Sequence, residues 1–203
     1  MIDKLIELDK QFLLFFNGNH LPWLDPVMLF ITETFVWLPL YLFLIYLIVK
    51  DYRKEAWIAL IGIGVTILLS DQITASLMKP YFARLRPSQE PTLEGLVHLV
   101  DGYKGGKYGF ASSHAANTFG TATFFWLLFG EKRKWILFLF AWAALMTYTR
   151  LYLGVHYPGD ILVGALVGVL SGIVGHRVFV WINRRQRGEK KPTAATTSSH
   201  TSR

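Results

Sequence analysis

Long apolar runs constrain what this chain can fold into more than any other feature of its sequence. Five of them have the composition expected of membrane-spanning helices: residues 27–49, 56–78, 115–129, 135–153 and 161–182. The third is short, and we expect it to extend backwards through His114. The last run places small residues on one helix face, for close helix contact, at Gly164, Gly168 and Gly172. The sequence therefore predicts an all-α fold, a polytopic membrane helix bundle with about five transmembrane helices.

Composition supports this fold class. With 52% apolar residues and a mean hydropathy of +0.33, the chain is too apolar for an ordinary soluble domain. Residues 1–20 are expected to form an amphipathic helix in the membrane interface, and a first helix packed within the bundle is an equally good interpretation. Residues 184–203 are basic and then rich in Thr and Ser, which predicts a disordered cytoplasmic tail. The transmembrane domain is accordingly expected to span residues 21–183.

Basic clusters set the expected orientation of the spans. They follow the first, third and fifth apolar runs, at residues 50–54, 132–134 and 184–191, so the positive-inside rule places these ends in the cytoplasm. The same clusters account for the net charge of +7 without nucleic-acid binding. The links 79–113 and 154–159 then share the outer face. The longer link nevertheless carries several basic residues, which an anionic ligand would explain: Lys79, Arg84, Arg86, Lys104 and Lys107.

One segment, TRLYLGVHYPGD at residues 149–160, carries residue types suited to phosphate chemistry. Arg150 is expected on the last turn of one helix, His156 in the link, and Asp160 at the N-cap of the next helix. Arginine binds phosphate oxygens with a planar fork of donors. Histidine can attack phosphorus or transfer a proton, and a carboxylate behind it fixes its tautomer. The segment therefore predicts one wall of a phosphate site.

Two other outer segments are expected to converge on this one. The first runs from Lys79 to Arg86 and supplies cations. The second contains Ser112, Ser113 and His114, at the start of a helix whose free N–H groups and dipole favour an anion. No group of Asp, Glu and His residues has the spacing of a metal site, so we expect neither a metal nor a cofactor.

In order and spacing, the three segments resemble the signature of the phosphatidic acid phosphatase type 2 superfamily of membrane lipid phosphatases. That signature is Lys, six residues, Arg-Pro; then Pro-Ser-Gly-His; then Ser-Arg, five residues, His, three residues, Asp. The matching positions are Lys79, Arg86, Pro87, Ser112, His114, Arg150, His156 and Asp160. Three positions differ from the signature: Ala111 stands in place of Pro and Ser113 in place of Gly in the second part, and Thr149 in place of Ser in the third. Ser113 leaves the backbone of its turn less free than Gly would.

The resemblance implies a role for each matching residue. His156 would attack phosphorus and form a phosphohistidine, while Asp160 would orient it and support its charge. His114 would protonate the leaving oxygen and later activate water. The phosphate oxygens would be held by cations, a hydroxyl and backbone N–H groups: Lys79, Arg86, Arg150, Ser112 and the backbone near Ser113.

The implied function is hydrolysis of a lipid phosphate or diphosphate at the outer face of a bacterial inner membrane, by the domain at residues 21–183. Its expected partners are the lipid substrate and the bilayer; the oligomeric state is not predicted. Undecaprenyl diphosphate is the first expected substrate, with phosphatidylglycerophosphate and lipid A as alternatives. A different class, a non-enzymatic transporter of lipids or ions, stays open. Outside the signature, we expect solvated or headgroup-facing roles for Arg84, Lys104 and Lys107.

Two acids within the apolar runs have no place in the signature. Glu33 and Asp71 are each expected roughly 10 Å beneath the outer boundary, from the helical rise of about 1.5 Å per residue. An ionisable group at such depth faces the bundle interior, a wet cavity or a cation. We therefore expect a polar pocket below the phosphate site, lined by one or both acids. Simple hydrogen bonds to neighbouring helices are the alternative.

Overall fold

The structure, a computed structural model, describes residues 2–188, and every regular element within them is helical. The main helices are α1 (Ile2–Gly18), α2 (Asp25–Thr32), α3 (Leu38–Tyr52), α4 (Ala56–Asp71), α5 (Lys79–Phe82), α6 (Ser113–Phe129), α7 (Phe138–Tyr152) and α8 (Pro158–Gly188). Short 3-10 or π-helical elements connect them: η1 (Thr34–Trp37), η2 (Arg53–Glu55), η3 (Gln72–Met78), η4 (Pro87–Gln89), η5 (Pro91–Leu93), η6 (Val100–Gly102) and η7 (Lys134–Leu137). The predicted all-α fold is confirmed for these residues.

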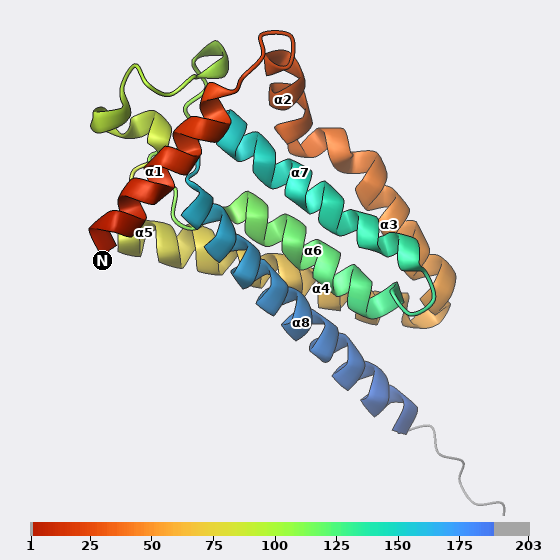
Figure 1. The fold of residues 1–203 in the computed structure, drawn as a ribbon. Coiled ribbons are helices and arrows are strands. Elements are labelled where there is room, and N and C mark those ends of the chain that lie inside the picture. Colours follow the sequence, from red (N-terminus) through yellow and green to blue (C-terminus); the bar gives the residue numbers. More distant parts are fainter. Residues whose placement is uncertain (1, 189–203) are drawn as a thin grey trace, which may run out of the picture.

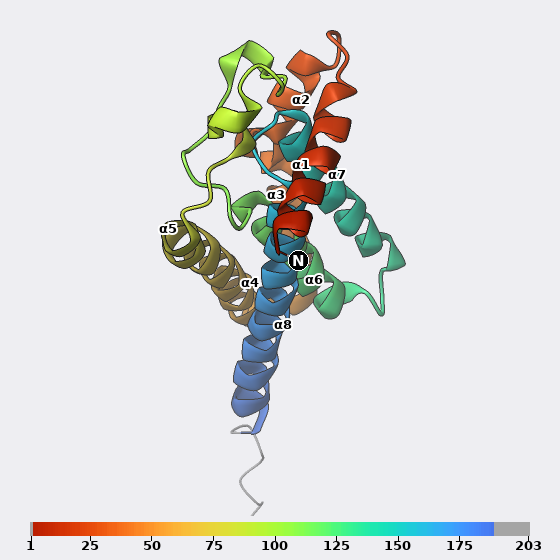
Figure 2. The ribbon, with the colours of Figure 1, turned by 60° about the vertical axis from the view of Figure 1, so that its left-hand side comes forward.

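Helix α6 forms the centre of the bundle and contacts α4, α7 and α8 (Figure 1). Its buried Phe124 and Phe125 pack in one apolar core with Ile58 of α4 and Met146 of α7. Helix α3 adds Leu44 to this core. Both ribbon views show α8 running along α6 and continuing beyond the other helices (Figure 2). The bundle thus holds the N-terminal ends of α6 and α8 next to each other.

Helix α8 packs closely on α6 because of its regularly spaced glycines. A Cβ added at Gly164 would lie 2.4 Å from the carbonyl oxygen of Ser112, and one at Gly168 would lie 2.3 Å from that of Ala116. A Cβ added at Gly172 would lie 2.7 Å from the carbonyl oxygen of Gly120 in α6. Real Cβ atoms do not approach so closely, so any larger residue would push the helices apart. The predicted small-residue face is therefore used as expected.

Gly168→Ala is expected to destabilise the folded protein by about 1–3 kcal/mol, the cost of overpacking a tight contact. The added methyl group would meet the backbone of Ala116, which cannot rotate aside as a side chain could. Gly64→Ala is the matched control, because nothing lies within 4 Å of a Cβ at that helical position. Thermal unfolding of both variants in detergent makes the comparison, and equal Tm values would contradict the close packing inferred here.

The first predicted span, residues 27–49, is not one continuous helix. Helix α2 ends at Thr32, the backbone of Glu33 is extended (φ −74°, ψ 131°), and the chain continues through η1 into α3. Pro39 lies in the first turn of α3, where a proline costs no hydrogen bond. At the other end of the chain, α8 continues to Gly188, five residues beyond the boundary predicted for the transmembrane domain, and residues 189–203 lie outside the described part.

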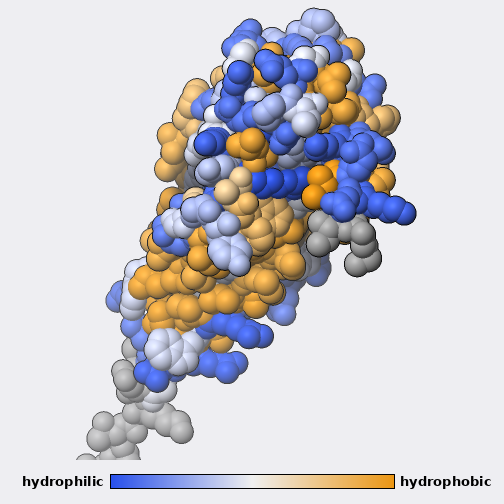
Figure 3. Space-filling view, turned by 90° about the vertical axis from the view of Figure 1, so that its left-hand side faces the viewer, coloured by the Kyte–Doolittle hydropathy of each residue, from blue (hydrophilic) through white to orange (hydrophobic). Residues whose placement is uncertain are grey.

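Three stretches of the described chain are long and apolar enough to cross a membrane: Thr34–Phe82, Lys134–Tyr152 and Pro158–Gly188. The first reverses direction near Arg53, between α3 and α4. Helix α6, with 17 residues, is shorter than any of these three stretches. The face in Figure 3 carries an apolar band across its middle, with polar surface towards both ends. Membrane spanning is thus supported, while the count of five crossings stays a prediction.

The predicted basic clusters, as far as residue 188, gather at one end of the bundle, which we call the basic end. There Arg133 Nη2 donates to Asp51 Oδ1 at 2.8 Å, joining the α6–α7 turn to the end of α3. The ring of Tyr52 meets that of Phe179 on α8, with centroids 5.2 Å apart. The links 83–112 and 153–157 lie at the opposite end, which we call the site end (Figure 1). This arrangement agrees with the charge-based orientation.

Single cysteines test which side of the membrane each end faces. The natural chain has no cysteine, so Glu94→Cys at the site end and Lys132→Cys at the basic end would each carry the only thiol. Both positions are exposed. In intact cells, an impermeant maleimide should label Glu94→Cys and leave Lys132→Cys unlabelled until the membrane is opened. Labelling of both from the same side would overturn the predicted orientation.

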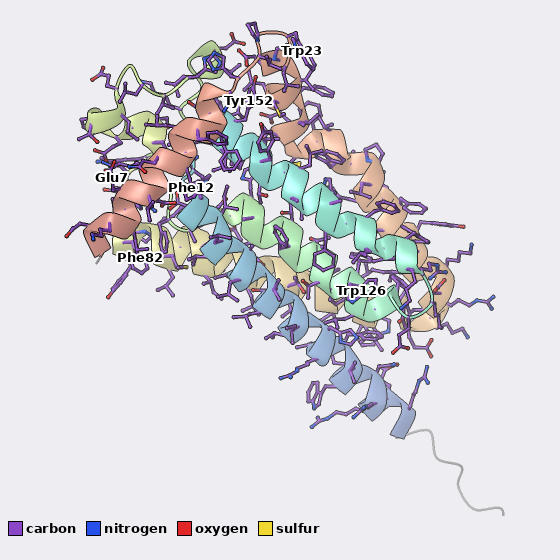
Figure 4. The ribbon with its side chains drawn as sticks, viewed as in Figure 1. Glu7, Phe12, Trp23, Phe82, Trp126 and Tyr152 are labelled. Atoms are coloured by element: carbon purple, nitrogen blue, oxygen red, sulfur yellow. The ribbon has the colours of Figure 1, made fainter. Side chains whose placement is uncertain are left out.

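Helix α1 is docked on the site end by one face. Leu13 is fully buried, and Asn17 Nδ2 donates to the carbonyl oxygens of His98 and Tyr152 at 2.9 and 2.7 Å. Tyr152 lies where the C-terminal ends of α1 and α7 meet (Figure 4). The opposite face exposes apolar side chains: Leu5, Leu8, Phe12 and Phe15. Helix α1 is therefore packed on the bundle by one face and leaves an apolar face free to contact lipid, while its place in the membrane interface stays a prediction.

Candidate active site

The structure brings the three signature segments together at the site end. Lys79, in the last helical turn before the long link, donates from Nζ to Ser113 Oγ at 2.9 Å. The backbone N–H of Ser112 donates to the carbonyl oxygen of Asp160, also at 2.9 Å. These two bonds tie the first segment to the second and the second to the third. The three segments chosen by spacing therefore meet at the site end.

His156 and Asp160 form a buried pair in the third segment. His156 Nδ1 lies 3.3 Å from Asp160 Oδ2, and the two residues are 1% and 0% exposed. Asp160 Oδ2 also accepts the backbone N–H of Tyr157 at 3.0 Å. With Nδ1 facing the carboxylate, Nε2 is the ring nitrogen left for attack on phosphorus.

The protonation state of His156 suits a nucleophile. Burial, followed by the positive charges of Arg86 and Arg150, holds the pKa of His156 well below its usual range. The imidazole is therefore neutral at pH values where an exposed histidine would already be charged. A neutral ring keeps the electron pair that bond formation to phosphorus requires.

Arg150 is held in place by two hydroxyl groups. Its Nη1 donates to Thr32 Oγ1 at 2.6 Å and its Nη2 to the Tyr103 hydroxyl at 3.1 Å. The residue is only 1% exposed, and its Nε is buried with no hydrogen-bond partner among the described residues. A buried guanidinium N–H without an acceptor is costly, and a phosphate oxygen would supply the missing acceptor.

Arg86 is wrapped by the long link. Its Nε donates to the carbonyl oxygen of Tyr108 at 3.1 Å. Gly105, at φ +63°, allows close approach, because a Cβ there would lie 2.3 Å from Arg86 Nη1. Burial, and then the charge of Arg150, lowers the pKa of Arg86 from its ordinary value. Positive charge thus accumulates in one small volume, which is the electrostatic setting of a phosphate site.

The start of α6 completes this charged volume. Ser112 is the N-cap, its Oγ accepting the N–H of Ala115 at 3.4 Å, so the first turn directs free N–H groups to the site end. His114 lies near His156, and the charges of Arg150, Arg86 and Lys79 act on it. Among the described residues, no group of three or more His, Asp and Glu side chains could hold a metal ion.

The predicted pocket acids are placed differently from each other. Asp71, half-buried at the end of α4, lies near Lys79, on which its charge acts. Glu33 is exposed at the break between α2 and η1. Neither acid forms an ion pair within residues 2–188. The role of Asp71 in a polar pocket stays a prediction, and the structure gives Glu33 no contact with the phosphate site.

The structure also reveals contacts that sequence reasoning missed. Arg84 was expected to be solvated, yet it donates from Nη1 to Asp160 Oδ1 at 2.9 Å. Asp9 of α1 accepts from Arg84 Nη2 at 2.7 Å. Thr32 and Tyr103 hold Arg150. The only sequence signal for Arg84 is its position two residues before Arg86; nothing in the sequence links Asp9 to this site.

Comparison with known proteins identifies the family. The PAP2 superfamily matches residues 55–184, which include the whole set of signature residues. The chain belongs to the PAP2 superfamily. It is a membrane phosphatase, an enzyme that hydrolyses phosphate esters of lipids.

Three PAP2 relatives and one solved PAP2 structure show how similar the chain is to characterised proteins. It is 43% identical to the lipid A 4'-phosphatase of Bacteroides thetaiotaomicron, over 85% of this chain and 77% of the relative. The lipid A 4'-phosphatase of Porphyromonas gingivalis is 34% identical over 94% of this chain and 81% of the relative. An undecaprenyl-diphosphatase of Sulfolobus acidocaldarius is 33% identical over 75% of this chain and 69% of the relative. The crystal structure of Aquifex aeolicus LpxE has a TM-score of 0.66 and 30% identity, covering 84% of this chain and 95% of that one.

Proposed function

We propose that this enzyme removes a phosphate from lipid A, at its 4' position. The observation that carries the proposal is the 43% identity to a lipid A 4'-phosphatase over 85% of the chain. A second lipid A 4'-phosphatase aligns with 94% of the chain, further than the undecaprenyl-diphosphatase, which aligns with 75%. Lipid A therefore replaces undecaprenyl diphosphate as the first expected substrate.

In the proposed mechanism, Nε2 of His156 attacks phosphorus. A P–N bond forms as the bond from phosphorus to the sugar oxygen breaks, and His114 gives a proton to that oxygen. Water then attacks the phosphohistidine while His114 accepts a proton, which releases inorganic phosphate and restores both histidines. Asp160 supports the positive charge that develops on His156. The phosphate oxygens are held by Lys79, Arg86, Arg150, Ser112 and the N–H groups near Ser113.

The reaction takes place, in this proposal, at the outer face of a bacterial inner membrane. Support comes from the basic clusters at the opposite end of the bundle from the phosphate-binding residues. The links at the site end carry no separate soluble domain, and the exposed apolar face of α1 borders them. A lipid can therefore present its headgroup sideways from the bilayer. The domain at residues 21–183, with α1 docked on it, would form the catalytic unit.

A substrate panel tests the proposed function. The purified protein in detergent is given lipid A, undecaprenyl diphosphate or phosphatidylglycerophosphate, and inorganic phosphate release is measured. We expect kcat/KM to be highest for lipid A, with fragment mass spectrometry locating the loss at the 4' position. A higher kcat/KM for undecaprenyl diphosphate, or loss from another position of lipid A, would refute the substrate assignment. Release from no lipid at all would refute the function itself.

A further inference from the structure

We propose that Arg84 and Asp9 form a positioning pair that holds Asp160 behind His156, which makes helix α1 part of the machinery that sets the phosphoryl-transfer rate. The inference deepens the proposed function, since it rests on His156 being the nucleophile. Neither residue belongs to the signature that the sequence carries. Both are positioning residues, because they act through Asp160 and not on the substrate.

The contacts form a continuous chain from α1 to the nucleophile. Arg84 donates from Nη1 to Asp160 Oδ1 at 2.9 Å and from Nη2 to Asp9 Oδ2 at 2.7 Å. The other oxygen of Asp9, Oδ1, accepts the backbone N–H of Gly159 at 2.7 Å. Asp9 therefore binds both the guanidinium and the first turn of α8, the turn that carries Asp160. A movement of α1 would disturb both ends of this arrangement.

Asp160 depends on these contacts for its orientation. Its Oδ2 faces Tyr157 N–H and His156 Nδ1, so Oδ1 is the oxygen left for Arg84. The side chain is 0% exposed, and Arg84 is its one ion-pair partner besides His156 among the described residues. Without Arg84, a buried carboxylate would lose its charged donor, and only the contacts of Oδ2 would still hold its orientation towards His156. Outer contacts of this kind fix the geometry of the groups that react.

Arg84 is itself fixed from two sides. Its guanidinium lies over the ring of Tyr157, 4.0 Å from the ring centroid. Its carbonyl oxygen accepts the N–H of Gly109 at 2.9 Å. A Cβ at Gly109 would lie 2.9 Å from Asp160 Oδ2 and 3.5 Å from His156 Nδ1, so the link packs directly on the catalytic pair. Such a rigid guanidinium suits orientation of a neighbouring residue better than capture of a mobile headgroup.

Matched variants test the pair, with rates measured on the best lipid substrate and on an activated aryl phosphate. Arg84→Gln should lower kcat on the order of 10–100-fold, the usual effect of losing a partner that orients a reacting group, with KM changed less than about twofold. Asp9→Asn should lower kcat in the same way by a smaller factor. Arg84→Lys should recover part of the loss, because an ammonium keeps the charge but cannot span both carboxylates.

The control is Glu7→Gln, a change of charge on the same helix. Glu7 is exposed and lies on the outward side of α1 (Figure 4), where its side chain accepts only from Gln11 among the described residues. This variant should keep wild-type kcat. The double variant Asp9→Asn/Arg84→Gln should be no slower than Arg84→Gln alone, because Asp9 acts through Arg84. Equal Tm values in detergent confirm that each variant is folded, and Asp9→Asn and Arg84→Lys carry the test if Arg84→Gln unfolds.

Two results would overturn the positioning pair. A raised KM with unchanged kcat in Arg84→Gln means that Arg84 contacts the substrate headgroup. Wild-type kcat in Asp9→Asn means that α1 has no part in the reaction. Both outcomes are independent of the substrate assignment, because the ratio of variant to wild-type kcat can be measured on any lipid of the panel and on the aryl phosphate. Failure of lipid A as a substrate would thus refute the proposed function alone.

Discussion

His156→Ala is expected to abolish turnover and to leave no acid-labile phosphoenzyme. The ring is buried, neutral and backed by Asp160, and no other side chain of the site combines these properties. Removing the nucleophile of a covalent enzyme lowers kcat by roughly four to six orders of magnitude. The measurement has two parts: steady-state phosphate release, and acid-quench trapping of labelled phosphate on the protein.

His176→Ala is the control for this prediction. His176 lies on α8 next to the ring of Phe124 in the apolar core, and it has no place in the signature. Its loss should leave the phosphoenzyme and its acid lability intact. Trapped phosphate that persists in His156→Ala would assign the nucleophile to another residue and would invalidate the mechanism proposed here.

The sequence was sufficient to predict which of the proposed reacting groups lie close together. Arg150, His156 and Asp160 sit at fixed short separations around a helix–link–helix junction, and such local spacing survives folding unchanged. Lys79 and Ser113 were placed together by topology alone, since consecutive spans must return to the same face, and the structure joins them at 2.9 Å. The spacing of residues within a short segment and the alternating direction of consecutive spans can both be predicted directly from a membrane protein's sequence.

Contacts that depend on how a whole element docks were beyond the sequence. Asp9 meets Arg84 across 75 positions of chain, and only the docking of α1 on the site end brings them together. The break at Glu33 could not be predicted from hydropathy, because apolar residues continue on both sides of it. The sequence therefore shows one apolar run where the backbone forms two helices. For the same reason Thr32, at the end of α2, was not foreseen as a partner of Arg150.

His114→Ala is expected to slow poor leaving groups far more than good ones. The proposed general acid gives its proton to the departing oxygen, and an alkoxide from a sugar needs that proton while an activated phenolate does not. Loss of a general acid costs about 10²–10⁴-fold when the leaving group is poor. We therefore expect a loss of that size for the lipid and a much smaller loss in phosphoenzyme formation from an activated aryl phosphate.

The control for His114→Ala is a variant that lowers the rates on the lipid and on the aryl phosphate by the same factor. Arg150→Lys serves, because Thr32 and Tyr103 hold its guanidinium in place and its proposed role is to bind the phosphate itself and not the leaving group. Its effect should be similar for lipid and aryl phosphate, and EDTA should change neither rate. If His114→Ala also slows both equally, then His114 binds phosphate and donates no proton to the leaving group. The leaving oxygen would in that case take its proton from water, and the leaving-group dependence would be the same in wild type and variant.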